Sequence, residues 1–299
     1  MDAGQRVLVY LSRNNGPAQR ARFQQSIVGH FSPSHEDSRV VHCGKERHRF
    51  LISDREFPGS TQVLLKRPSF CPIKGLDETQ AASLPVEVRD RGVDVGVAVL
   101  LQSATQKVLL TRRSKRLGIF PNVWVPPGGH VEPAEELLEA GLRELQEETG
   151  LRLRDHEFSC HTLGLWESVY PPYLSRGLPR RHHVVLYLWL LSQDTHQQLE
   201  ERLKPNEAEV SACAWLDPRL LVTIAATGNE GGGARRGDAD LPPTVRITRL
   251  ENGSPKTVAI PTTTFLSSAP AHGEDLERVS TGTKFALQRW LKTSGVQAE

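Results

Sequence analysis

Three glutamates near the middle of the chain are spaced so that one turn of helix would gather their carboxylates. Glu144, Glu147 and Glu148 stand at positions i, i+3 and i+4, and side chains at these spacings are neighbours on a helix. With Glu144 at 0° on a helical wheel, Glu148 falls at about 40° and Glu147 at about −60°. Such like charges repel one another, and Mg²⁺ or Mn²⁺ with oxygen ligands would relieve the repulsion. The pattern predicts a metal site; the alternative is an acid-rich, solvated helix face.

The helix expected to carry these acids runs from about Ala134 to Thr149 and ends at Gly150, a residue suited to a helix C-terminus. Its apolar stripe lies at about 80° to 160° on the same wheel. The stripe comprises Ala134, Leu138, Leu142, Leu145 and Thr149. The carboxylates therefore flank the side expected to be buried. Arg143 is the only basic residue between Glu135 and Gly150, so few ion pairs along this helix would offset the acids.

A longer pattern surrounds the glutamates. From Gly129 to Leu151 the sequence reads GHVEPAEELLEAGLRELQEETGL. It fills every specified position of G-x5-E-x7-R-E-U-x-E-E-x-G-U, where U is a bulky aliphatic residue, and so resembles the Nudix box. The resemblance implies an α/β fold of the Nudix type, an α/β/α sandwich with a mixed, curved sheet and a loop–helix–loop catalytic motif. It also implies hydrolysis of a pyrophosphate linkage in a nucleoside diphosphate derivative, with Mg²⁺ or Mn²⁺ as cofactor.

The resemblance assigns roles to the acidic residues. Glu144 and Glu148 match the firmest metal ligands of the motif, and Glu147 matches a further ligand or the base that deprotonates a metal-bound water. The cation would neutralise phosphate oxygens and lower the pKa of that water, and a carboxylate would remove its second proton. Two later acids, Glu207 and Glu209, are candidates for an additional ligand or base; the alternative is that they belong to a solvated loop.

The same resemblance concerns a pair of charged residues and a pair of glycines. Arg143 and Glu135 are expected to form a buried ion pair that orients the helix, and both are counted with the catalytic machinery. Gly128 and Gly129 are expected to let the backbone approach the metal and the substrate, or to form an ordinary tight turn. Pro126–Gly129 is predicted to be a loop, because this sequence suits neither a helix nor the middle of a strand.

Two basic groups are candidates for contacts with substrate phosphates, the alternative being solvated surface charge. The first comprises Arg112, Arg113, Lys115 and Arg116, and the second comprises Arg180, Arg181, His182 and His183. From these groups we select Arg112 and Arg181 as substrate-binding residues. Four aromatic residues are candidates for stacking on a base, or else pack in the core. They are Trp124, Trp166, Tyr170 and Tyr173.

The stretch LLTRRSKRLGIFPNVWVPPGGHVE resembles Nudix members that hydrolyse messenger-RNA caps. The implied substrate is N7-methylguanosine-capped RNA, which would yield 7-methyl-GDP and 5′-phosphorylated RNA. One alternative is a small nucleoside diphosphate derivative, such as a dinucleotide, a coenzyme or a damaged nucleotide. Another is a non-catalytic Nudix-fold binding module, against which the intact acidic triad counts, since binding alone needs no clustered repulsive carboxylates.

Composition shifts divide the chain into an N-terminal accessory region at 1–88, a Nudix domain at 89–236 and a C-terminal extension at 237–299. In the first region we expect a strand at Arg6–Leu11, a helix at Ala18–Phe31 and an apolar run at Gln62–Lys66. The strands expected in the second are Val93–Leu101, Lys107–Thr111, Cys160–Trp166, Val184–Leu191 and Ala212–Leu216.

Further along the chain, Asp217 is expected to cap a helix from Pro218 to about Ala226. A Gly-rich linker at 228–243 follows. Beyond it we expect an edge strand or a loop at Val245–Leu250 and a helix at Thr283–Leu291.

Charge and cysteine content narrow the protein class. The chain has 37 basic and 35 acidic residues, too near balance for charge alone to indicate a nucleic-acid binder. The four cysteines contain no CxxC pair, so we expect free thiols in a reducing compartment. We expect no signal peptide or membrane span, and hence an intracellular, cytoplasmic protein. No obligate protein partner is inferred.

Overall fold

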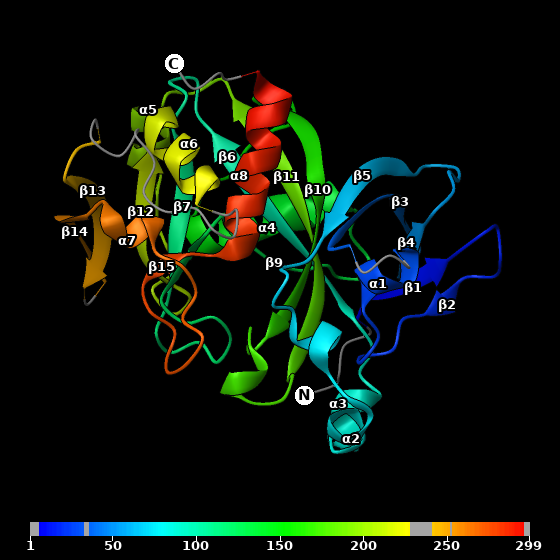
Figure 1. The fold of residues 1–299 in the computed structure, drawn as a ribbon. Coiled ribbons are helices and arrows are strands. Elements are labelled where there is room, and N and C mark those ends of the chain that lie inside the picture. Colours follow the sequence, from blue (N-terminus) through cyan, green and yellow to red (C-terminus); the bar gives the residue numbers. More distant parts are fainter. Residues whose placement is uncertain (1–5, 33–35, 228–240, 252, 296–299) are drawn as a thin grey trace. The chain divides into compact units, whose positions relative to one another are not determined.

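The computed structural model describes residues 6–32, 36–227, 241–251 and 253–295 of the 299-residue chain (Figure 1). Most of the linker predicted at 228–243 lies outside these residues, as does the predicted boundary between 236 and 237. Within the described ranges, no helix is long and apolar enough to cross a membrane. The chain contains helices and a sheet with both parallel and antiparallel strand pairs. This confirms the predicted α/β class.

The chain divides into two compact units, each made of several segments. The first unit comprises 1–97, 129–140 and 164–187, and the second comprises 98–128, 141–163 and 188–299. Four strands contribute residues to both units: β6 (Asp94–Gln102), β9 (Gly128–His130), β10 (Phe158–Tyr170) and β11 (Arg181–Ser192). The sequential boundaries at 88/89 and 236/237 stay a prediction.

The first unit is a ring of paired strands. Its N-terminal strands are β1 (Leu8–Ser12), β2 (Gln19–Arg20), β3 (Ser38–Glu46), β4 (Arg49–Ser53) and β5 (Thr61–Lys66). The strands are paired in the order β6-β11-β10-β5-β3-β4-β1, and Leu8 of β1 also pairs with Asp94 of β6, which closes the ring. β1 pairs with β4 in parallel and β5 with β10 in parallel, whereas β3 is antiparallel to β4 and β5. Val9, Phe50 and Ile52 are fully buried in this unit.

The helix predicted at Ala18–Phe31 is wrong for most of its length. Gln19 and Arg20 form β2 beside β1, and only Ile27–Phe31 is helical (α1). Ala21 donates its N–H to Val9 O, a long-range strand contact that a local helical pattern does not reveal. Ser26 sets the start of α1, because its hydroxyl accepts the N–H of Gly29. The remaining helices of this unit are short: α2 (Glu78–Ala82), α3 (Val86–Arg89) and two 3₁₀ helices, Pro72–Gly75 and Leu174–Arg176.

The second unit adds strands β7 (Val108–Arg113), β8 (Val123–Val125), β12 (Val210–Leu216), β13 (Thr244–Glu251), β14 (Ser254–Pro261) and β15 (Arg278–Val279). Their order is β14-β13-β12-β7-β6, and β8 joins β7 to β15. β13 pairs with both β12 and β14. The strand expected at Val245–Leu250 is present as β13, but its expected place at the edge of the sheet is wrong, because the unpredicted β14 covers that edge.

Besides most of α4 (Leu137–Thr149), the described part of the second unit contains α5 (His196–Glu201), α6 (Pro218–Ala226), α7 (Thr263–Leu266) and α8 (Thr281–Ser294). As predicted, Asp217 caps α6, accepting the N–H of Leu220, with Pro218 at the first position. α6 and α8 pack side by side (Figure 1). The core includes a polar centre at Gln102, whose Oε1 accepts the indole N–H of Trp189 at 2.8 Å and of Trp290 at 3.0 Å.

Candidate functional site

Helix α4 (Leu137–Thr149) carries the three glutamates and begins later than predicted. Ala134 is exposed and lies in a turn, so its place in the predicted helix and apolar stripe is wrong. The reason is a pair of side-chain contacts: Glu132 N–H donates to Glu135 Oε1 at 2.9 Å, and Glu136 N–H donates to Glu139 Oε2 at 2.7 Å. The second contact is one half of a capping box and sets the helix start.

The rest of the predicted apolar stripe agrees with the burial along α4 in part, since Leu138 and Leu142 are only half-buried. Leu145 and Thr149 are fully buried, and Glu148 is only 4% exposed. The side chain of Glu144 is 12% exposed and that of Glu147 is 55% exposed. The carboxylates thus lie on a gradient from the core to solvent, in the order in which the wheel places them relative to the apolar stripe.

Glu148 is the most constrained of the three acids. Gly128 N–H donates to its Oε1 and Thr111 Oγ1 to its Oε2, both over a long 3.4 Å. Burial raises the pKa of Glu148 to about 8; Arg113 and the Gly128 N–H lower this pKa, whereas Glu144 and Glu209 raise it further. The carboxylate is therefore buried without enough positive charge to balance it. This is the environment in which a divalent cation with oxygen ligands fits.

Arg143 lies against the two neighbouring acids. Its Nη1 donates to Glu144 Oε1 at 2.8 Å and to Glu147 Oε2 at 3.0 Å, and so offsets part of the repulsion between them. The pKa of Glu144 is nevertheless raised, chiefly by burial. Glu135 belongs to the first unit and Arg143 to the second, and the predicted ion pair between them stays a prediction.

The two glycines before the helix lie in a strand instead of the predicted loop. Gly128–His130 forms β9, which pairs with β6. At Gly96 a side chain would begin only 3.2 Å from Gly129 O, so a residue without a Cβ lets these two backbones approach closely. Because its N–H points to Glu148, Gly128 does bring backbone to the acid cluster. The predicted roles of both glycines toward metal and substrate stay predictions.

Arg113 lies at the acid cluster, although of the first basic group only Arg112 was selected from the sequence as a substrate-binding residue. It alternates with Arg112 along β7, so it shares a strand face with Thr111, and its charge acts on Glu144, Glu148 and Glu209. Its Nε and Nη2 donate to Ile119 O at 3.2 and 3.1 Å. Burial lowers the pKa of Arg113, while the three acids raise it. Period-two alternation along the strand was the signal that could have identified it.

Arg112, the selected substrate-binding residue, lies in a different environment. It is 6% exposed; its Nε donates to Ser211 Oγ at 2.9 Å and its Nη1 to Glu277 Oε1 at 3.0 Å. Its guanidinium lies 5.8 Å from the ring centre of Trp124, whose indole N–H donates to the same Glu277 oxygen at 3.0 Å. These contacts bind the strand to the segment before β15. The predicted contact of Arg112 with substrate stays a prediction. The buried contacts of its guanidinium with Ser211 and Glu277 do not favour it.

The two later acids differ. Glu209 is exposed, raises the pKa of Glu148 and of Glu144, and is held by its backbone carbonyl, which accepts the N–H of Ser114 at 2.7 Å. Glu207 instead accepts the N–H of Gly253 with its side chain at 2.7 Å. Glu209 is therefore the better candidate for an additional ligand or base.

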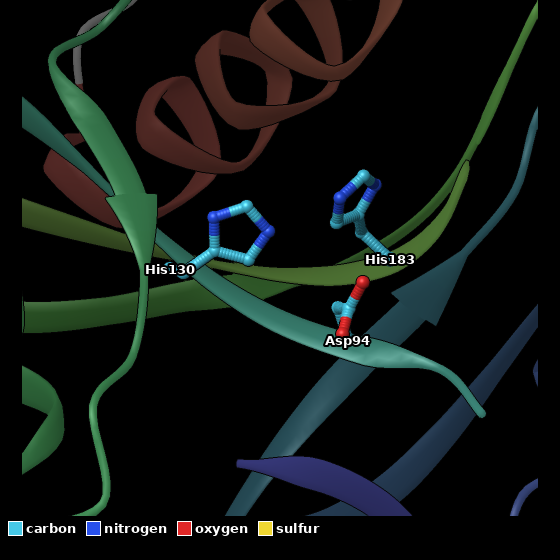
Figure 2. A group of neighbouring side chains, drawn as sticks. All are labelled: Asp94, His130 and His183. Atoms are coloured by element: carbon cyan, nitrogen blue, oxygen red, sulfur yellow. The ribbon is translucent and has the colours of Figure 1, made fainter. Parts of the chain in front are cut away.

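The second basic group belongs to the first unit. His182 is fully buried, with Nδ1 2.6 Å from Phe23 O and Nε2 3.1 Å from Glu167 Oε1, so its buried contacts give it a structural role. Arg181 is half-buried, and its predicted substrate contact stays a prediction. His183 lies beside His130 (Figure 2), with ring centres 5.3 Å apart.

The four aromatic candidates for stacking are mostly buried. Trp124, Trp166 and Tyr170 are at most 8% exposed, which agrees with core packing. Tyr173 is half-buried and stacks on Phe70, with ring centres 4.3 Å apart.

Comparison with known proteins now identifies the class. Residues 91–233 match the NUDIX domain family, and the chain belongs to the Nudix hydrolase family. The m7GpppN-mRNA hydrolase NUDT17 of Xenopus laevis is 57% identical, over 97% of this chain and 96% of that protein. The protein of the same name from Danio rerio is 53% identical, over 98% of this chain and 97% of that protein. The one from Homo sapiens is 51% identical, over 85% of this chain and 78% of that protein. The stretch 109–132 indicated a similarity to one member of this family, the nucleoside diphosphate-linked moiety X motif 17 protein. These matches confirm that similarity.

Proposed function

We propose that this protein hydrolyses N7-methylguanosine-capped RNA and releases 7-methyl-GDP and 5′-phosphorylated RNA. The observation that carries the catalytic part is the burial of Glu148 beside Glu144 on α4 with incomplete balancing charge. The substrate part is supported by the printed name of the relatives, m7GpppN-mRNA hydrolase. Hydrolysis of a small nucleoside diphosphate derivative is the alternative activity that the test below distinguishes.

Mg²⁺ or Mn²⁺ is the proposed cofactor. Glu144 and Glu148 would hold the ion, with Glu147 as a further ligand or as the base. The donors are all carboxylate oxygens, which these hard cations prefer. When bound, the ion would supply charge neutralisation at the phosphate oxygens and a lower pKa for the attacking water.

The chain's own residues supply orientation and a proton acceptor. Arg143 holds Glu144 and Glu147 in place through the two hydrogen bonds of its Nη1. The exposed carboxylate of Glu147 is the proposed base, because it can accept a proton without desolvation. Water attacks one phosphorus of the pyrophosphate linkage in line, the P–O bond to the leaving phosphate breaks, and the proton of the water passes to the carboxylate.

The test compares substrates under matched conditions. Purified protein with Mg²⁺ is assayed on capped RNA, cap dinucleotide, ADP-ribose and coenzyme A. We expect capped RNA to be preferred, with 7-methyl-GDP as product. Glu148→Gln should lower the rate by orders of magnitude, because the ion that activates the water loses a ligand, whereas Glu207→Gln, which alters a contact with Gly253, should retain it. A preference for ADP-ribose or coenzyme A would overturn the cap assignment, and full activity of Glu148→Gln would overturn the site.

A further inference from the structure

A second group of side chains of the kinds that bind metal ions lies within the first unit. Asp94, His130 and His183 each offer one ligand atom, and these atoms lie within 4.8 Å of one another. Figure 2 shows the two imidazole rings and the carboxylate turned toward a common space. Asp94 is 1% exposed, His183 is half-buried and His130 is exposed. The group is thus anchored in the core at one end and open to solvent at the other.

The three side chains come from strands, which fixes their relative positions. Asp94 begins β6, His130 ends β9 and His183 lies on β11. β6 is the neighbour of both other strands, and Val131 N–H donates to Val95 O at 3.1 Å next to two of the candidate ligands. Sites built on strands hold their geometry better than sites on loops.

The surroundings of Asp94 determine which cation would suit the group. Arg6 Nη1 donates to Oδ1 at 2.7 Å and Arg91 Nε donates to Oδ2 at 3.1 Å. These bonds orient the carboxylate and leave each oxygen a further lone pair. They also offset its negative charge, so a hard cation that depends on anionic oxygen gains little here. The two imidazoles instead favour a borderline transition metal.

We propose that Asp94, His130 and His183 bind Zn²⁺ and discriminate against Mg²⁺. Three protein ligands plus water is a common coordination of Zn²⁺. With Zn–N and Zn–O distances of about 2.0–2.1 Å, tetrahedral ligands lie about 3.3 Å apart. No separation in the group therefore has to close by more than about 1.5 Å, within reach of a rotation of the exposed His130 side chain. The proposal is independent of the reaction catalysed at α4.

The experiment is a calorimetric titration of Zn²⁺ into the full chain, with any purification tag removed and with excess Mg²⁺ to occupy the carboxylates of α4. We expect one equivalent of Zn²⁺ to bind. His130→Ala and His183→Ala should each weaken the affinity by at least about tenfold. The matched control is His48→Ala, another exposed histidine of the same unit, which should bind as the unaltered chain does.

Asp94→Asn removes the carboxylate that two arginines contact and can disturb folding, so the exposed His130 gives the decisive variant. Circular dichroism establishes that each variant is folded. Co²⁺ absorption bands supply a second readout, because tetrahedral ligation gives intense d–d transitions that His130→Ala should abolish. The proposal would be overturned if the chain bound no Zn²⁺, or if excess Mg²⁺ displaced the Zn²⁺. It would also be overturned if both His130→Ala and His183→Ala bound Zn²⁺ as tightly as the unaltered chain.

Discussion

Replacing Glu148 with glutamine should stabilise the cation-free protein, and more strongly as the pH rises. Burial raises the pKa of Glu148 from 4.5 to about 8 in the folded chain. Between these two values the folded state keeps a proton that the unfolded state has lost. The stabilisation from that proton is fully present below the unfolded pKa and is lost as pH rises through the folded pKa. Glutamine has nearly the same shape as protonated glutamate but does not titrate. The stability of Glu148→Gln therefore does not fall with pH for this reason.

The size of the effect follows from the pKa difference. One unit of pKa corresponds to about 1.4 kcal/mol, so the free energy of unfolding of the unaltered chain falls by at most that amount per pH unit over this range. Between pH 5.5 and 7.5 the upper limit is about 2.7 kcal/mol. Relaxation around a buried charge reduces it, and we expect the stability difference between Glu148→Gln and the unaltered chain to grow by about 1–3 kcal/mol.

The assay is urea unfolding in excess chelator at several pH values from 5.5 to 7.5, followed by circular dichroism. Subtracting the two unfolding free energies at each pH cancels the titration of the groups that do not interact with Glu148. Glu207→Gln is the control for removing a carboxylate elsewhere in the chain, since the Glu207 side chain accepts the N–H of Gly253. A pH-independent difference for Glu148→Gln would refute the view that this carboxylate is buried without sufficient balancing charge.

Three other substitutions probe buried contacts of the two units by their free energies of unfolding. Glu167→Gln should destabilise the chain by about 1–3 kcal/mol or more, because the fully buried carboxylate accepts from His182 and two backbone N–H groups of α1; an unchanged urea midpoint would contradict this. Glu277→Ala should cost about 1–3 kcal/mol, since a guanidinium and an indole lose their shared acceptor, and wild-type stability would exclude that contact. Gln102→Leu leaves two buried indole N–H groups without an acceptor and should cost about 2–4 kcal/mol, whereas a neutral result would mean that both indoles find other partners.

The acidic part of the site could be read from the sequence because its geometry is local. Spacings of three and four residues decide which side chains share a helix face, and no distant contact is needed to place Glu144, Glu147 and Glu148 together. The order of their burial was also predictable, since the apolar residues of α4 fix the buried side. The start of the helix was not, because Glu139 captures the N–H of Glu136 and excludes Ala134 from the first turn.

Contacts between distant segments account for what the sequence did not indicate. Arg113 acts on the acids because β7 lies near α4, and Glu277 meets Trp124 across 153 residues of chain. The histidines of Figure 2 come together because β6 pairs with β9 and neighbours β11. A helix at 18–31 was expected from local periodicity, but pairing with β1 overrides that periodicity for residues 19–20.

Burial gives Glu148 and Glu147 different chemistry although they are adjacent in the sequence. Glu147 is solvated and accepts a hydrogen bond from Arg143. Glu148 has lost most of its hydration, and among the described residues its carboxylate accepts two long hydrogen bonds. A cation that restores its charged form recovers the free energy that burial removed. Glu148 lowers the stability of the cation-free chain near neutral pH. For the same reason we expect Glu148 to contribute most to cation affinity.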